Sequence, residues 1–104
     1  MAWIVKGVCM KEEFRPAYKK FLEAWGEDAQ IMMAIEEMSE LTKELCKYLR
    51  YKGFKEKDAE SVVENINEET ADVLNCVEQL ELIFNEKKIN GIRKEKIDRT
   101  LKKV

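Results

Sequence analysis

The chain has 104 residues, of which 38% are charged and 45% hydrophobic, and its formal net charge is −2. This length suits one domain, residues 1–104, with a modest core, and the small net charge gives no reason to expect nucleic acid or an anionic membrane as a partner. No apolar run approaches the roughly 18 residues of a membrane span. Three widely spaced cysteines, Cys9, Cys46 and Cys76, without a CxxC motif, are typical of reduced thiols in a cytoplasmic protein.

The first predicted helix covers about Glu13–Trp25. Its apolar residues recur at helical spacing: Phe14, Ala17, Tyr18, Phe21, Leu22 and Trp25. Pro16 is tolerated only in a first turn, so the helix is expected to begin just before it. Gly26 is expected to end the helix as its C-cap. Residues 1–11, before the helix, show no readable pattern.

A second, longer helix is predicted over Gln30–Arg50, which contains no Gly or Pro. One side of it collects apolar residues: Ala34, Met38, Leu41, Leu45 and Leu49. Asp28 can cap its beginning. Glu37 and Glu40 lie at the border of the apolar stripe, and their spacing of three lets both carboxylates reach one point in space.

The third predicted helix, Ser61–Phe84, carries Glu69 inside its apolar stripe and Asp72 at the edge of that stripe, although carboxylates seldom face a core. The break before it lies around Tyr51–Lys55, with Gly53 as the expected C-cap and Asp58 or a neighbouring residue as the cap of the next helix. If the chain reverses there as an antiparallel hairpin, Glu40 lies level with Glu69, and Glu37 lies level with Asp72.

Four ionised carboxylates at one spot would repel one another and lose hydration. A divalent cation supplies the missing positive charge. Oxygen ligands without His or Cys suit a hard ion, Mg²⁺ first and Mn²⁺ second. The alternative is a solvated acidic face, the usual fate of Glu on a helix; it is favoured for any one of the four residues, whereas the register-matched set favours a metal site.

The pattern Glu36-Glu37-x-x-Glu40, followed after a spacer by Glu69-x-x-Asp72, resembles the EExxE…ExxD signature of MazG-type, all-α nucleoside triphosphate pyrophosphohydrolases. The flanking segments Trp25-Gly26-x-x-x-Gln30 and Asp72-Val73-Leu74 also resemble those of this family. The resemblance covers roughly residues 14–84. It implies hydrolysis of a nucleoside triphosphate to the monophosphate and pyrophosphate in nucleotide pool house-cleaning. Deoxynucleotides are the favoured substrates, although the sequence leaves the base and sugar open.

The resemblance assigns roles to the acidic residues. Mg²⁺ held by Glu37, Glu40, Glu69 and Asp72 would bridge phosphate oxygens and hold the attacking water. Glu36 is either an outer ligand or the base that orients that water, so Glu36 and Glu37 are the catalytic candidates. The chain has no His, which also counts against a ferritin-like di-iron site.

Six residues are candidates for substrate binding. Phe21 and Trp25 are either core residues or, as the resemblance implies, walls of the nucleobase pocket, and the Gln30 amide can read a Watson–Crick edge. A triphosphate also needs basic groups. Lys47, Lys96 and Arg99 are among the candidates, although a basic stretch such as residues 85–104 is usually a solvated face or tail.

The predicted fold is all-α, with about four helices forming a helical hairpin. A hairpin with apolar residues around much of each helix needs a second hairpin against it, so a homodimer with a four-helix-bundle core is expected, and a tetramer remains open. The competing hypothesis for function is a noncatalytic helical dimer that acts as a binding or regulatory module.

Overall fold

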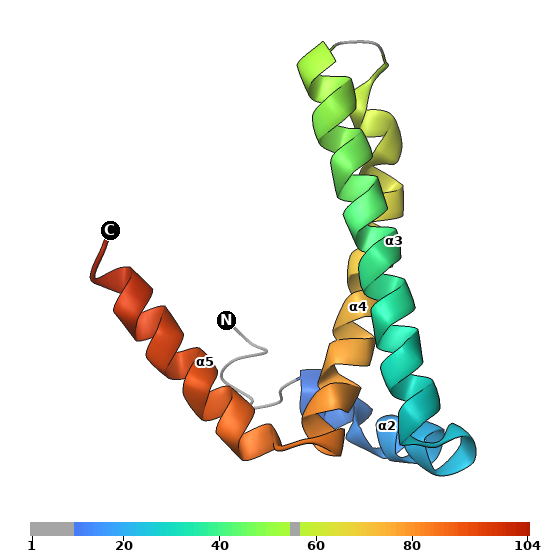
Figure 1. The fold of residues 1–104 in the computed structure, drawn as a ribbon, viewed down its shortest axis with the longest axis vertical. Coiled ribbons are helices and arrows are strands. Elements are labelled where there is room, and N and C mark those ends of the chain that lie inside the picture. The colour runs from blue at the N-terminus through green and yellow to red at the C-terminus, as the bar shows by residue number, and fades with distance from the viewer. Residues whose placement is uncertain (1–9, 55–56) are drawn as a thin grey trace.

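The computed structural model describes residues 10–54 and 57–104; residues 1–9, which include Cys9, and residues 55–56 lie outside the description (Figure 1). The described residues form α2 (Met10–Trp25), α3 (Glu27–Phe54), the 3₁₀ helix η1 (Ala59–Val62), α4 (Val63–Ile83) and α5 (Glu86–Leu101). No strand occurs among them. The all-α prediction is confirmed.

Helix α2 begins at Met10, a few residues earlier than predicted, so Pro16 lies inside the helix and not in its first turn. Because proline lacks an N–H group, the helix does without one backbone hydrogen bond at that position. Gly26 ends α2 as predicted: its φ of 88° is left-handed, and its N–H donates to the Leu22 carbonyl at 2.9 Å.

Helix α3 begins directly after Gly26, at Glu27. The prediction that Asp28 caps this helix from outside is therefore wrong. Asp28 lies in the first turn, where a negative charge still interacts favourably with the exposed N–H groups of the helix.

The end of α3 also differs from the prediction. The helix runs through Gly53 to Phe54, and Gly53 does not adopt a positive φ, so it is not a C-cap. The predicted cap of the next element is confirmed, because Asp58 Oδ1 accepts a hydrogen bond from the Glu60 N–H at 3.0 Å. Helices α3 and α4 then run side by side as an antiparallel hairpin, the main packing contact of the fold (Figure 1).

The core of this hairpin is small and partly polar. Ala34 of α3 and Cys76 of α4 are its buried apolar residues, Tyr18 of α2 and Val62 of η1 are buried beside them, and no large side chain among the described residues is completely buried. Gln30 of α3 and Gln79 of α4 are buried as well, and Gln30 Nε2 donates to Gln79 Oε1 at 2.7 Å. This bond satisfies polar groups that would otherwise lose water without compensation.

Polar contacts also attach the outer helices. Arg15 of α2 donates to both carboxylate oxygens of Glu86 at 2.7 and 2.6 Å, a bidentate pair that joins α2 to α5. The buried Glu81 accepts a hydrogen bond from Asn90 Nδ2 at 2.7 Å, joining α4 to α5. Beyond this anchored beginning, α5 leads away from the hairpin (Figure 1).

Much of the predicted apolar stripe of α3 is not covered by the other residues that the structure describes. Ala34 is buried, but Met38, Leu45 and Leu49 are exposed, Leu49 by 66%. Leu74 of α4 and Phe84, which follows α4 as its C-cap, are exposed too. No helix in the described part of the chain is long and apolar enough to cross a membrane.

The Gln30–Gln79 hydrogen bond predicts that a single substitution destabilises the fold more than the matching double substitution. Gln30→Leu leaves the buried Oε1 of Gln79 without its donor and should lower the free energy of unfolding by about 1–3 kcal/mol. The double variant Gln30→Leu/Gln79→Leu removes both polar groups and should recover much of that loss. Urea denaturation at pH 7 measures both, and additive losses in the double variant would contradict the pairing.

Candidate metal centre

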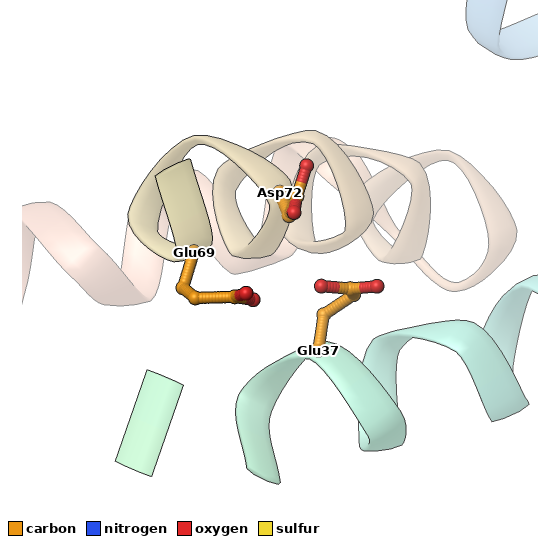
Figure 2. Close-up of side chains that lie close together, drawn as sticks. All are labelled: Glu37, Glu69 and Asp72. Carbon is orange, nitrogen blue, oxygen red and sulfur yellow. The ribbon is translucent and has the colours of Figure 1, made fainter. Parts of the chain in front are cut away.

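Three carboxylates converge where α3 and α4 pack together. One oxygen each from Glu37, Glu69 and Asp72 lies within 4.8 Å of the other two, and Figure 2 shows the Glu37 and Glu69 side chains pointing toward one another across the hairpin. Glu37 and Glu69 are half-buried, whereas Asp72 is exposed. The group is therefore open to solvent on one side.

The local sequence explains this convergence. Glu69 and Asp72 are three residues apart on α4, which places both on one face of that helix. The antiparallel packing of α3 against α4 then brings Glu37 opposite them. Glu37 and Asp72 are one of the two pairs that the predicted hairpin register placed level.

The electrostatics of the group are unfavourable without a cation. Burial raises the pKa of Glu37 above its usual value of 4.5, and the nearby charges of Asp72 and Glu69 raise it further. Oε2 of Glu69 is buried and has no hydrogen-bond partner among the described residues. None of the three carboxylates forms an ion pair with a lysine or arginine in the described part of the chain.

These features fit a hard divalent cation. A cation between α3 and α4 would neutralise the mutual repulsion, and the unpartnered Glu69 oxygen offers it a ligand. The donor set consists of oxygen atoms, which Mg²⁺ and Mn²⁺ accept.

Two other acidic residues of the predicted site stand apart from this group. Glu40, the fourth predicted ligand, is exposed on α3 and is not among the three converging carboxylates. Glu36, the candidate base, is also exposed on α3. The structure thus brings together three of the four residues that the sequence assigned to the metal.

The residues predicted to bind the base lie on α2 and at the beginning of α3. Phe21 and Trp25 stack on each other, with ring centroids 5.5 Å apart and planes 23° apart, and Trp25 is 63% exposed. The pair therefore stands at the surface and not in the core. Gln30 is buried, and its amide nitrogen donates to Gln79, which gives this residue a structural role.

The predicted phosphate-binding residues are spread over two helices. Lys47 is half-buried on α3, and its Nζ lies 3.3 Å from Glu44 Oε2. Lys96 and Arg99 are exposed on α5. Neither α5 residue forms an ion pair with any residue that the structure describes.

Two residues near the carboxylate group, Glu44 and Cys76, were not predicted to belong to the site. Glu44 is largely buried, and its Oε1 accepts a hydrogen bond from Asn65 Nδ2 at 3.3 Å. Glu44 follows Glu37 by two helical turns and so lies on the same face of α3, which is the sequence feature that could have identified it. Cys76 lies one turn after Asp72; burial raises the pKa of its thiol, and the charges of Glu37 and Asp72 add to the effect.

Comparison of the chain with protein-family models, with curated proteins and with solved structures found no significant match. The likeness to the MazG-type enzymes therefore depends on the two acidic motifs and their hydrophobic context.

The raised pKa of Glu37 predicts a pH dependence of stability in the metal-free protein. The folded state holds the Glu37 proton more tightly than the unfolded state, so stability falls as the pH rises from about 4.5 through the raised pKa. Melting temperatures in EDTA between pH 4.5 and 8 should show this fall. Glu37→Gln should flatten the profile, whereas Glu68→Gln, an exposed neighbour of Glu69, should not; identical profiles for all three proteins would contradict the prediction.

Proposed function

We propose that the protein hydrolyses nucleoside triphosphates, with deoxynucleotides favoured, to the monophosphate and pyrophosphate in a Mg²⁺-dependent reaction of cytoplasmic nucleotide house-cleaning. The observation that carries the proposal is the convergence of Glu37, Glu69 and Asp72 within 4.8 Å between two antiparallel helices. The sequence motifs around these residues support the choice of reaction.

Each acidic residue has a place in the proposed chemistry. Glu37, Glu69 and Asp72 would hold Mg²⁺, and Glu40 would join them from the next turn of α3. When bound, Mg²⁺ supplies positive charge against the phosphate oxygens and lowers the pKa of a coordinated water. Glu36 remains the candidate base that orients the attacking water, since the chain contains no His for that task.

A homodimer is part of the proposal. The described chain completely buries no large side chain, and it exposes apolar residues along both hairpin helices. Exposed apolar surface of this kind marks association sites. A second hairpin packed on α3 and α4 would produce a four-helix-bundle core, and the same surfaces are compatible with a tetramer.

The exposed apolar faces also favour a second candidate function, a noncatalytic helical module that binds another protein. The position of Glu40 outside the carboxylate group fits this alternative. A folded protein that binds Mg²⁺ without turning over nucleotides would support the noncatalytic module over the enzyme.

Metal binding predicts a thermal shift. Mg²⁺ at about 100 times its dissociation constant should stabilise the wild type by about 2.7 kcal/mol. Glu69→Gln, which removes one ligand charge, should lose most of this shift, while Glu68→Gln should retain it. Differential scanning fluorimetry over a Mg²⁺ series measures the effect, and an unshifted wild type at millimolar Mg²⁺ would count against the metal centre.

The enzyme proposal predicts pyrophosphate release from at least one member of a panel of common deoxynucleoside and ribonucleoside triphosphates with Mg²⁺ or Mn²⁺. Glu37→Gln should lower kcat by at least about 100-fold, because a site charge that acts on the transition state is lost. Glu68→Gln, which adds the same amide one residue from Glu69, is the matched control. Release that persists in Glu37→Gln would overturn the assignment of this site.

A further inference from the structure

Three polar pairs connect α3 with α4 at equal intervals, each with one residue from either helix: Gln30–Gln79, Glu37–Asp72 and Glu44–Asn65. Successive pairs are seven residues apart on both helices, forward along α3 and backward along α4. Seven residues make almost two helical turns, so the pairs recur on the same side of each helix. Glu37–Asp72 is called the middle pair below, and the other two are called the outer pairs.

The outer pairs are hydrogen-bonded through an amide donor. Gln30 Nε2 donates to Gln79 Oε1 at 2.7 Å, and Gln79 Nε2 donates to the Asn75 carbonyl of its own helix at 3.2 Å, which turns Oε1 toward Gln30. Asn65 Nδ2 donates to Glu44 Oε1 at 3.3 Å. The middle pair consists of two carboxylates, which have only acceptors when they are ionised. The outer pairs therefore join the two helices on either side of a pair that repels.

Apolar packing specifies the alignment of α3 with α4 only weakly. Ala34 and Cys76 are the buried apolar residues of these two helices, and both side chains are small. Apolar contacts of this kind can form in several alignments, whereas a hydrogen-bonded pair needs one donor opposite one acceptor. Single polar residues at regular positions between packed helices are known to specify their register.

A cation at the middle pair depends on this register. Mg²⁺ takes ligands at about 2.0–2.1 Å in a nearly octahedral arrangement. A slide of two residues would move Glu37 by about 3 Å relative to Asp72, which such an arrangement does not tolerate. The outer pairs stand seven residues away, about 10 Å along each helix, so they cannot touch the cation. Any effect of the outer pairs on its binding must pass through the alignment of the helices.

We propose that the two outer pairs position the metal centre, because they hold α3 and α4 in the register that sets Glu37 level with Asp72. Their four members are positioning residues and not metal ligands. The part of the inference that concerns the cation depends on the proposed function, whereas the control of register does not. Linkage is reciprocal, so a cation bound at the middle pair should in turn strengthen the outer pairs.

Replacing the glutamine pair by leucines separates positioning from stability. Gln30→Leu/Gln79→Leu should keep a midpoint of urea unfolding close to that of the wild type, since both polar groups leave together. Its dissociation constant for Mg²⁺ should nevertheless rise at least about tenfold, as for other residues that support metal ligands. Titration of the ¹⁵N-labelled protein with MgCl₂, followed by NMR, measures this constant.

The matched control is Thr42→Leu/Thr70→Leu, which also adds one leucine to each helix but at exposed positions. This variant should bind Mg²⁺ like the wild type. An unchanged dissociation constant in Gln30→Leu/Gln79→Leu would overturn the proposal, because the register would then be held without the glutamine pair.

The second outer pair is tested with two variants of one residue. Glu44→Leu removes both the acceptor of Asn65 and a negative charge, whereas Glu44→Gln removes the charge and keeps an acceptor. Lys47 loses its ion pair with Glu44 in both variants, so that loss cancels in the comparison. Glu44→Leu should weaken Mg²⁺ binding and Glu44→Gln should largely retain it. Equal weakening in both would show that the charge acts on the cation and would overturn the positioning role of this pair.

The register itself is measured without metal. Spin labels on Ala29→Cys of α3 and Ala71→Cys of α4, two exposed positions, are placed in a chain whose native cysteines are replaced by serine or alanine. The labelled chain is diluted with unlabelled chain in EDTA, so that pulsed EPR reports the distance within one chain. With the native pairs the labels should give one distance, and Gln30→Leu/Gln79→Leu should broaden or shift it by about 1.5 Å per residue of slide.

The failure of this proposal and the failure of the proposed function give different results. A wild type that binds no Mg²⁺ would refute the metal centre and the proposed function, while a label distance that changes in Gln30→Leu/Gln79→Leu would still support the control of register. One unchanged label distance, together with unchanged Mg²⁺ binding in the variants of the outer pairs, would refute the positioning and leave the proposed function standing.

Discussion

Repulsion among Glu37, Glu69 and Asp72 is the constraint on which the rest of the structure depends. The packing of α3 on α4 holds oxygens of all three within 4.8 Å, and burial of Glu37 makes its ionised form still less favourable. A hairpin with this cost needs apolar contacts elsewhere along its length, and Ala34 and Cys76 provide buried ones. A cation would turn the repulsion into attraction and make the same group stabilising.

The small core explains why specific polar bonds matter in this fold. Few apolar side chains are buried, so contacts such as Gln30–Gln79 help to align α3 with α4, and Arg15–Glu86 joins the beginning of α5 to α2. Each of these bonds requires a defined partner, whereas apolar packing tolerates several arrangements. Apolar side chains that the small core does not bury lie exposed on the hairpin instead. Packing against a second copy would bury them.

Charge is divided between the carboxylate group and α5. The hairpin carries the converging carboxylates of Glu37, Glu69 and Asp72, and eight lysine and arginine residues gather in residues 86–104, on a helix that points elsewhere. In the described part of the chain, no lysine or arginine pairs with the three carboxylates.

Features that depend on neighbours in sequence could be predicted: the helices from their periodicity, the turn at Gly26 from its backbone freedom, and the approach of Glu37 to Asp72 from the hairpin register. Periodicity reports only the angle of a side chain about its own helix axis. The separation of Glu40 from the other acids, the burial of Gln30 against Gln79 and the direction of α5 depend on contacts between distant segments. The sequence by itself therefore determined the helices and which residues lie level across the hairpin, and the tertiary structure decided which carboxylates meet, because only packing sets distances between helices.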